Sequence, residues 1–292
     1  MSGADHGVGA NSPAVEIASG AVATPAPARV PAARAFPVWL LAFTVPVIGL
    51  IAWQLATAGK AFSLIPPPTT VGVTLWDYLF GGIRNDPYSG AFLANAIASI
   101  GRVYGGFFVA MIVALPLGLI LGRSTFARGL IDPTLQFLRP IPVTAWLPLT
   151  MILFGLGPPA TIALIALGTF FPMLLNTVGG VRMVEPRLIE AAEMLGTPKT
   201  AIFTRVILPA ALPSIFTGIR IGLGQAWVLL VVGEMTGVPT GLGANIMDAR
   251  QLSRTDLVIT GMIVIGVLGF LSDRIVMLIG RRALWWNPSA RG

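Results

Sequence analysis

The sequence predicts an all-α integral membrane protein with six transmembrane helices. Only 11% of its 292 residues are charged, 55% are hydrophobic, and the mean hydropathy is +0.82. Soluble domains carry about 25% charged residues, so this chain has too little polar surface to face water all round. A bilayer core about 30 Å thick needs roughly 20 apolar residues in a helix. Six runs fit that length: Phe36–Ala56, Leu93–Leu121, Leu135–Leu156, Ala160–Val181, Ser214–Met235 and Leu257–Ile279.

The first 35 residues differ in composition from the apolar run that follows them. The stretch from Ala21 to Ala28 is small and proline-rich. Because such a segment buries too little surface to offset the entropy of ordering, residues 1–35 are predicted to be a disordered cytoplasmic tail. Phe36–Ala56 is then the first transmembrane helix. A cleaved signal peptide is the alternative, but its apolar core would be only about 7–15 residues long.

Prolines and glycines mark three segments that are not simple spans or loops. Pro140, Pro142 and Pro148 interrupt the third run, so its start is open. The three prolines of 66–68 predict a rigid turn, followed by a short external helix over Thr69–Phe80 that Thr69 or Thr70 would cap. The glycine-rich segment Gly237–Arg254 contains a short apolar piece, Leu242–Met247. It is expected either to lie on the outer surface or to re-enter the bundle.

The basic residues indicate how the chain crosses the membrane. Lys and Arg number 19 against 12 Asp and Glu, for a net charge of +7. They lie mainly between apolar runs, which is typical of cytoplasmic loops beside a lipid bilayer and argues against nucleic acid as the partner. Both termini are therefore predicted to be cytoplasmic. The cytoplasmic segments would hold Arg29, Arg34, Arg123, Arg128, Arg182, Arg187, Lys199, Arg205, Arg281, Arg282 and Arg291, and the external ones Lys60, Arg84, Arg250 and Arg254.

The most informative segment is the loop between the fourth and fifth runs, residues 182–213. Pro186 fits the first turn of a short helix, and Gly196 fits the position just past its end. A second helical stretch, Lys199–Ile207, is predicted to stop at Leu208-Pro209. The first helix could dock in a groove of a partner protein or lie on the membrane surface. Its predicted apolar stripe comprises Leu188, Ala191, Ala192 and Leu195.

The spacing in this loop resembles the EAA loop of binding-protein-dependent ABC importer permeases. Glu190-Ala191-Ala192 is followed after three residues by Gly196, and after nine more by Val206-Ile207-Leu208-Pro209. The family has Ile where Val206 stands. In that family the loop forms a coupling helix that docks in a cleft of the ATPase subunit. The resemblance implies coupling roles for Glu190, Ala191, Ala192, Gly196, Leu208 and Pro209.

The resemblance covers roughly residues 60–290 and looks like the nitrate/sulfonate/taurine branch of these permeases. The segments that carry it are Leu138–Pro142, Trp146–Leu149, Phe154–Gly157, Phe170–Pro172 with Asn176-Thr177, and Trp285–Pro288. It implies a type I importer architecture in a bacterial cytoplasmic membrane, with residues 57–292 as the permease core. Two copies would work with two ATP-binding subunits and an extracytoplasmic binding protein that delivers a small anion.

The chain lacks the motifs of ATP binding and catalysis. Its only lysines, Lys60 and Lys199, do not stand in the Gly-Lys-Ser/Thr context of a P-loop. ATP and Mg²⁺ are therefore expected in the partner subunit, with no cofactor or metal in this chain. There is no cysteine, and the single histidine, His6, lies in the predicted tail. No catalytic residues are expected, and the chain is not expected to be an enzyme.

Charged residues inside the apolar runs are candidates for the transport path, because each costs several kcal/mol in lipid unless it is paired or hydrated. Arg139 and Arg220 could lower the cost of bringing an anion into the membrane. Glu234 could instead neutralise a neighbour or serve as a gate element, and Arg102 could be interfacial. The alternative for the arginines is a position near the cytoplasmic ends of the helices or a role in fixing helix packing.

Glycine pairs at Gly105-Gly106 and Gly179-Gly180, and Gly118 with Gly122 four residues on, are predicted to mark close helix packing. Two other classes of protein remain as alternatives. A secondary transporter would show inverted repeats and paired carboxylates near the membrane midplane, and an integral-membrane enzyme would need catalytic polar groups. Neither feature is clear in this sequence.

Overall fold

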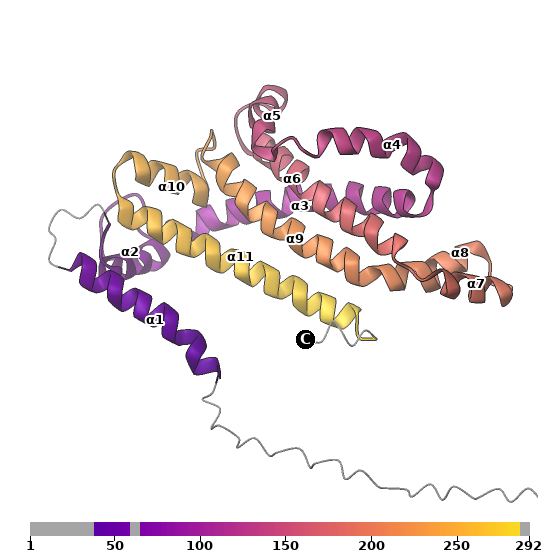
Figure 1. Cartoon of the computed structure of the whole chain (residues 1–292). Helices are drawn as coiled ribbons and strands as arrows, with labels where there is room; N and C mark the ends of the chain where they lie inside the picture. The colour runs from indigo at the N-terminus through magenta and orange to yellow at the C-terminus, as the bar shows by residue number, and fades with distance from the viewer. Residues whose placement is uncertain (1–37, 59–64, 287–292) are drawn as a thin grey trace, which may run out of the picture. The chain divides into compact units, whose positions relative to one another are not determined.

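The computed structural model describes residues 38–58 and 65–286, and every regular element in these two ranges is a helix (Figure 1). The predicted all-α class is confirmed there, whereas the predicted tail lies outside the described residues. In chain order the helices are α1 (Val38–Thr57), α2 (Pro68–Phe80), α3 (Phe92–Arg123), α4 (Thr125–Leu138), η1 (Val143–Trp146, 3-10), α5 (Leu147–Phe154), α6 (Pro158–Arg182), α7 (Pro186–Met194), α8 (Lys199–Ile202), η2 (Phe203–Ile207, a π-helical turn), α9 (Leu208–Glu234), α10 (Leu242–Gln251) and α11 (Thr255–Ala283).

Within the described residues, four helices are long and apolar enough to cross a membrane. They are α3, α6, the continuous helix Lys199–Glu234 and α11, and a fifth crossing exists if α4 and α5 count as one bent span. Each of the four contains or closely matches a predicted span. The first predicted span, Phe36–Ala56, falls on α1, whose two preceding residues are not described. Six crossings therefore stay a prediction.

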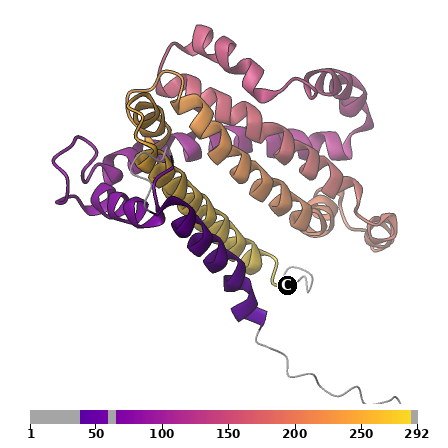
Figure 2. The same ribbon diagram turned by 60° about the vertical axis from the view of Figure 1, so that its left-hand side comes forward.

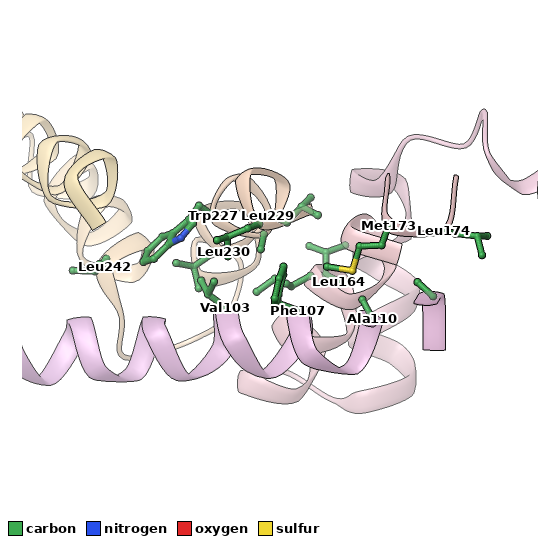
Figure 3. Packing of buried hydrophobic residues seen from close by; sticks show 14 of the residues in the cluster. Val103, Phe107, Ala110, Leu164, Met173, Leu174, Trp227, Leu229, Leu230 and Leu242 are labelled. Atoms are coloured by element: carbon green, nitrogen blue, oxygen red, sulfur yellow. The ribbon is translucent and has the colours of Figure 1, made fainter. Parts of the chain in front are cut away.

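Three of the long helices form the packed centre of the fold. α6 packs against α3 on one side and α9 on the other, and α11 lies beside α9 (Figures 1 and 2). Figure 3 shows Val103 and Phe107 of α3 facing Leu164 of α6 and Leu230 of α9. Lipid tails are as apolar as leucine, so tight packing rather than exclusion of water must hold these helices together.

Glycines provide that tight packing where α3 meets α6. A Cβ atom on Gly106 would lie 2.6 Å from the Ile165 Cβ, and one on Gly118 would lie 2.6 Å from the Thr177 Cβ. Gly122 is equally close to Val181, and Gly180 meets Ser214 of α9 at 2.7 Å. The predicted packing role is confirmed for these four glycines. It is wrong for Gly105 and Gly179, where a Cβ would meet no atom closer than 3.7 Å.

Replacing Gly118 by leucine is expected to destabilise the permease fold by about 1–3 kcal/mol or more, because the added side chain overpacks the α3–α6 contact. Thermal unfolding of the detergent-purified chain would show this as a lowered midpoint. Gly179→Leu is the matched control, since nothing lies within 4 Å of a Cβ at that helical position. Equal midpoints for the two variants would contradict the packing role of Gly118.

The prediction of one continuous span over Leu135–Leu156 is wrong. α4 begins well before it at Thr125 and ends at Leu138, and the halves Thr125–Leu138 and Val143–Phe154 are bent by 88°. Pro140 and Pro142 lack the backbone N–H that would continue the hydrogen bonds of α4, so the break falls there. Pro148 lies in the first turn of α5, where a missing N–H breaks no hydrogen bond.

Two predicted helix boundaries are also wrong. α2 confirms the short helix after the proline turn, but Pro67 is its cap residue and no side chain caps it. Leu208-Pro209 does not stop the second loop helix, because Lys199–Glu234 is continuous. The Leu208 N–H bonds the Phe203 carbonyl five residues back, and Pro209 then falls in the first turn of α9. The wider π-helical turn thus allows the helix to continue through Pro209 without a break.

The glycine-rich segment 237–254 folds onto the bundle. Most of it forms α10, which contacts α3, α9 and α11. Leu242 and Ala249 have no exposed surface, and Ala244 is 4% exposed. The apolar piece Leu242–Met247, whose place was open from the sequence, therefore packs against the long helices.

Candidate functional site

The loop 182–213 presents α7 on the ends of two long helices, α6 and α9 (Figure 1). Pro186 occupies the first turn of α7, as predicted, and Glu185 is the cap residue. On the inner face of α7, Ile189 and Ala192 pack against a small buried cluster. The core of that cluster comprises Val181, Val184, Ile202, Ile207, Ala211 and Ile215. The loop is therefore an ordered extension of the bundle.

Gly196 ends α7 in the predicted position, with a φ of +71°. Its N–H donates to the Glu193 carbonyl at 2.9 Å, and the Thr197 N–H donates to the Ala192 carbonyl at 3.1 Å. These two bonds form a Schellman cap, which needs a left-handed residue that glycine adopts without strain. The spacing from Ala192 to Gly196 thus has a physical reason: at this spacing Ala192 and Gly196 both take part in the cap that ends the helix.

The outer face of α7 is apolar and has no cover in the described structure. Leu188 is 50% exposed, Met194 90% and Leu195 85%. Glu190 and Ala191 are exposed on the same helix. Leu188, Ala191 and Leu195 of the predicted stripe therefore point outward, whereas Ala192 points inward. An exposed apolar patch flanked by charge is typical of a protein–protein contact.

Leu208 and Pro209 are not part of this outer face. Both are half-buried at the start of α9, and Leu208 packs against the same small cluster as Ala192. α8 and the π-helical turn lie between them and Gly196. The Arg123 guanidinium also lies 5.9 Å from the ring centre of Phe203, which brings the end of α3 to the loop. The predicted coupling residues therefore divide into three pairs: Glu190 and Ala191 on the exposed surface of α7, Ala192 and Gly196 in its cap, and Leu208 and Pro209 at the start of α9.

Away from this loop, Glu234 and Arg102 form a buried ion pair between α9 and α3. Glu234 is 1% exposed and Arg102 is 6% exposed. The Ser99 hydroxyl lies 2.8 Å from the Glu234 Oε1, and the Gly243 N–H donates to Oε2 at 2.8 Å. Arg102 also donates to the Thr240 carbonyl at 2.6 Å. We refer to Ser99, Arg102, Glu234 and Thr240 as the polar cluster.

Two glycines let the chain before and within α10 approach the polar cluster. A Cβ on Gly241, whose φ is +139°, would lie 2.5 Å from the Glu234 carboxylate, and one on Gly243 would lie 2.9 Å from the Glu234 Cβ. Gly241 also donates its N–H to the Asn95 Oδ1 at 2.8 Å. Glu234 is thus enclosed and fully paired, as expected of a group that neutralises a neighbour.

The turn that joins α2 to α3 is organised by a second carboxylate. Asp77 accepts hydrogen bonds from the N–H groups of Ile83 at 2.9 Å and Arg84 at 3.1 Å, and from the Ser89 hydroxyl at 2.9 Å. Burial alone would raise the pKa of Asp77, but these bonds to its charged form hold the pKa below its ordinary value.

The other predicted path residues lie apart from Glu234 and from each other. Arg220 is on α9, 14 residues or about 21 Å from Glu234 along the helix. It makes a two-point ion pair with Asp273 of α11, with Nε–Oδ1 at 2.8 Å and Nη2–Oδ2 at 2.9 Å. Arg139 is exposed at the end of α4. The structure does not bring the three residues into one site.

Asp273 was not predicted as a candidate residue, although a charged residue inside an apolar run is visible in the sequence. It stands in Ser272-Asp273-Arg274, inside the apolar run Leu257–Ile279, and is the one acidic residue of that run. Ser99, Thr240 and the glycines around Glu234 could not be found in this way, because their proximity to it is created by the fold.

Comparison with known proteins shows what this chain is similar to. Residues 114–285 match the family described as the binding-protein-dependent transport system inner membrane component. SsuC of Bacillus subtilis (strain 168), named as an aliphatic sulfonates transport permease, is 37% identical, with 87% of this chain and 90% of SsuC covered. TauC of Escherichia coli (strain K12), the taurine transport system permease protein, is 33% identical, with 84% and 88% covered.

The fold is also similar to a solved structure of the MetNI methionine ABC transporter in an inward-facing conformation. The TM-score is 0.55 at 20% identity, with 67% of this chain and 99% of that chain covered. This likeness concerns the fold alone. The family match and the relatives agree with the resemblance that the loop spacing predicted.

Proposed function

Because the chain belongs to the family of binding-protein-dependent transport system inner membrane components, we propose that it is the membrane subunit through which an ATP-driven importer moves a small organic or inorganic anion. As an ABC importer permease, the chain is not itself the enzyme of the system. ATP and Mg²⁺ would be bound and used by a separate ATPase subunit.

The observation that carries this proposal is the outer face of α7. It is a capped helix whose own inner residues, Ile189 and Ala192, pack against the small buried cluster. Leu188, Met194 and Leu195 are exposed on it, at the end of two long helices. Such a helix can transmit a force only if it keeps its shape, which the cap at Gly196 ensures. It supports docking in a groove of a partner by its apolar side chains.

The residues of the loop then have different roles in coupling. Glu190 and Ala191 would contact the ATPase, with the small alanine allowing close approach and the carboxylate orienting the contact. Ala192 and Gly196 would hold the shape of the helix through the cap. Leu208 and Pro209 would transmit the displacement, because they begin α9 within the continuous helix Lys199–Glu234.

The partners and the orientation follow from this assignment. Two copies of the chain, two ATP-binding subunits and an extracytoplasmic binding protein would form the importer in a bacterial cytoplasmic membrane. The loop 182–213 and both termini would face the cytoplasm, in agreement with the distribution of Lys and Arg. The predicted tail 1–35 would then be cytoplasmic as well.

The substrate class is inferred from the relatives and from the sequence motifs. SsuC and TauC are named for aliphatic sulfonates and taurine, and both classes carry a sulfonate group. We therefore place the substrate among small oxyanions: sulfonates, taurine, nitrate or bicarbonate. Arg139, Arg220 and Glu234 are the intramembrane charges first considered for its path. Of these, Arg220 has the position that favours contact with an anion, whereas Glu234 is enclosed.

The test is ATP hydrolysis by the complex reconstituted in proteoliposomes with its ATPase and binding protein, across a panel of these anions. One anion is expected to stimulate hydrolysis and to accumulate inside the vesicles. Failure of the ATPase to assemble with this chain would refute the coupling assignment. Assembly without stimulation by any of the anions would refute the substrate class and leave the coupling assignment in place.

A further inference from the structure

The ion pair between Arg220 and Asp273 lies deep within two apolar helices and is still accessible. Arg220 is about 18 Å along α9 from Leu208, and Asp273 is about 15 Å along α11 from Ala283. Their side chains are 44% and 38% exposed. Charged groups at such depth face a water-filled cavity or another protein surface rather than lipid. This face of α9 and α11 is therefore not a lipid-facing surface.

The pair lies at the edge of a cavity of about 410 Å³ between α9 and α11. Its volume lies within the usual range of sites for small ligands, about 300–1,000 Å³. The α9 side is formed around Arg220, Gly224 and Trp227, and the α11 side around Gly266, Gly269 and Asp273. A Cβ on Gly224 or on Gly266 would meet no atom within 4 Å, so both glycines leave open space.

Trp227, in the same wall, carries a hydrogen-bond donor without an acceptor. Its side chain is 5% exposed, and its Nε1 finds no partner among the described residues. The five-membered edge of its ring lies beside Gly269, where a Cβ would be 3.6 Å from the Trp227 Cγ. Because this N–H is buried, it does not open onto the cavity, and the donor that the cavity presents is the Arg220 guanidinium.

We propose that this cavity binds the transported oxyanion, with the Arg220 guanidinium as the donor and Asp273 as the counter-ion that the anion replaces. This inference rests on the function proposed above and names the site for its substrate. A sulfonate or similar anion offers oxygen acceptors for two N–H groups of the guanidinium. In the absence of the anion, Asp273 neutralises Arg220, so the site carries no unpaired charge between transport cycles.

The first test uses neutral variants of the pair in the reconstituted importer, with radiolabelled taurine and radiolabelled ethanesulfonate as probes. Arg220→Gln is expected to lower the uptake rate about 10- to 100-fold at saturating binding protein, the usual effect of losing a charged hydrogen-bond donor. Asp273→Asn is expected to keep more of the uptake, because Arg220 stays. Stimulation of ATP hydrolysis by loaded binding protein is expected to persist in both variants.

The double variant Arg220→Gln with Asp273→Asn separates binding from a purely structural role. It removes both charges and leaves none unpaired, so a structural pair would be replaced and uptake would return to within about twofold of the unchanged complex. An anion-binding Arg220 cannot be replaced in this way, and uptake is expected to stay as low as in Arg220→Gln. Recovery of uptake in the double variant would overturn the proposal.

A second test fills the cavity and leaves the charges in place. Gly266→Leu adds a side chain where no atom of the chain lies within 4 Å and is expected to block uptake without loss of folded protein. Gly101→Leu on α3, also in open space and outside the cavity, is the matched control and is expected to import normally. Normal uptake by Gly266→Leu would refute the proposed binding site and leave the proposed function of the chain in place. If the unchanged complex imports neither probe, the proposed function fails and this inference fails with it.

Discussion

Replacing Gly196 by proline is expected to abolish import while the chain remains inserted in the membrane. Proline fixes φ near −65°, whereas Gly196 has a φ of +71°, and proline has no N–H to donate to the Glu193 carbonyl. The Schellman cap would be lost, and with it the position of the outer face of α7. Uptake into proteoliposomes is expected to fall to the level measured without ATP, whereas the amount of chain inserted in the membrane is expected to stay the same.

Gly196→Asn is the matched control for this variant. Asparagine tolerates the left-handed conformation better than other residues with a side chain and keeps the N–H. It is therefore expected to retain most of the uptake.

Glu190→Lys tests the exposed surface rather than the cap. It is expected to abolish import because it reverses a charge at the contact, and Glu190→Gln is expected to have a smaller effect. Normal uptake by both Gly196→Pro and Glu190→Lys would disprove the coupling role of this loop.

Removing the Glu234 side chain is expected to cause the largest loss of stability. Arg102 is only 6% exposed, and Glu234→Ala leaves its guanidinium without its carboxylate partner. Breaking a buried ion pair by removing one partner costs about 3–5 kcal/mol. The contacts of Ser99 and of the Gly243 N–H with Glu234 would be lost as well. Thermal unfolding of the purified chain is expected to show a strongly lowered midpoint or little folded protein.

The double variant Arg102→Met with Glu234→Leu distinguishes the unpaired charge from the loss of contacts. Replacing a whole buried pair by apolar residues is often neutral, so this variant is expected to be more stable than Glu234→Ala. Asp132→Ala, which removes a carboxylate whose hydrogen bond to Gln136 is exposed, should hardly change the midpoint. If Glu234→Ala were as stable as Asp132→Ala, the polar cluster would not be a determinant of the fold.

The parts of the fold that sequence could predict are those set by local physics. The spans on α3, α6 and α11 follow from long apolar runs with few charges, and the end of α7 follows from the single glycine at a helix end. The coupling surface could be located by the spacing of its residues. The sequence could not tell which residues of α7 face outward, because Leu188 and Ala192 lie one turn apart and yet only Ala192 packs against the bundle.

The failed predictions of where helices break or end depend on how proline acts in a particular turn. Pro140 and Pro142 break the third run, whereas Pro209 and Pro213 lie within α9 without ending it. For Pro209 the difference is the π-helical turn before it, which no local pattern signals. The partners of Glu234 and Arg220 were likewise out of reach as pairs, because they come from helices 132 and 53 residues away in the chain.

The unbroken helix from Lys199 to Glu234 gives the molecule a lever. Its far end is pinned at Glu234 by the polar cluster, and its near end emerges from the loop that carries α7. At 1.5 Å per residue, Arg220 lies about 21 Å from the pinned end and Lys199 about 52 Å from it. If this helix turned as a rigid rod about Glu234, Arg220 would move about two fifths as far as Lys199, and its ion pair with Asp273 would be disturbed.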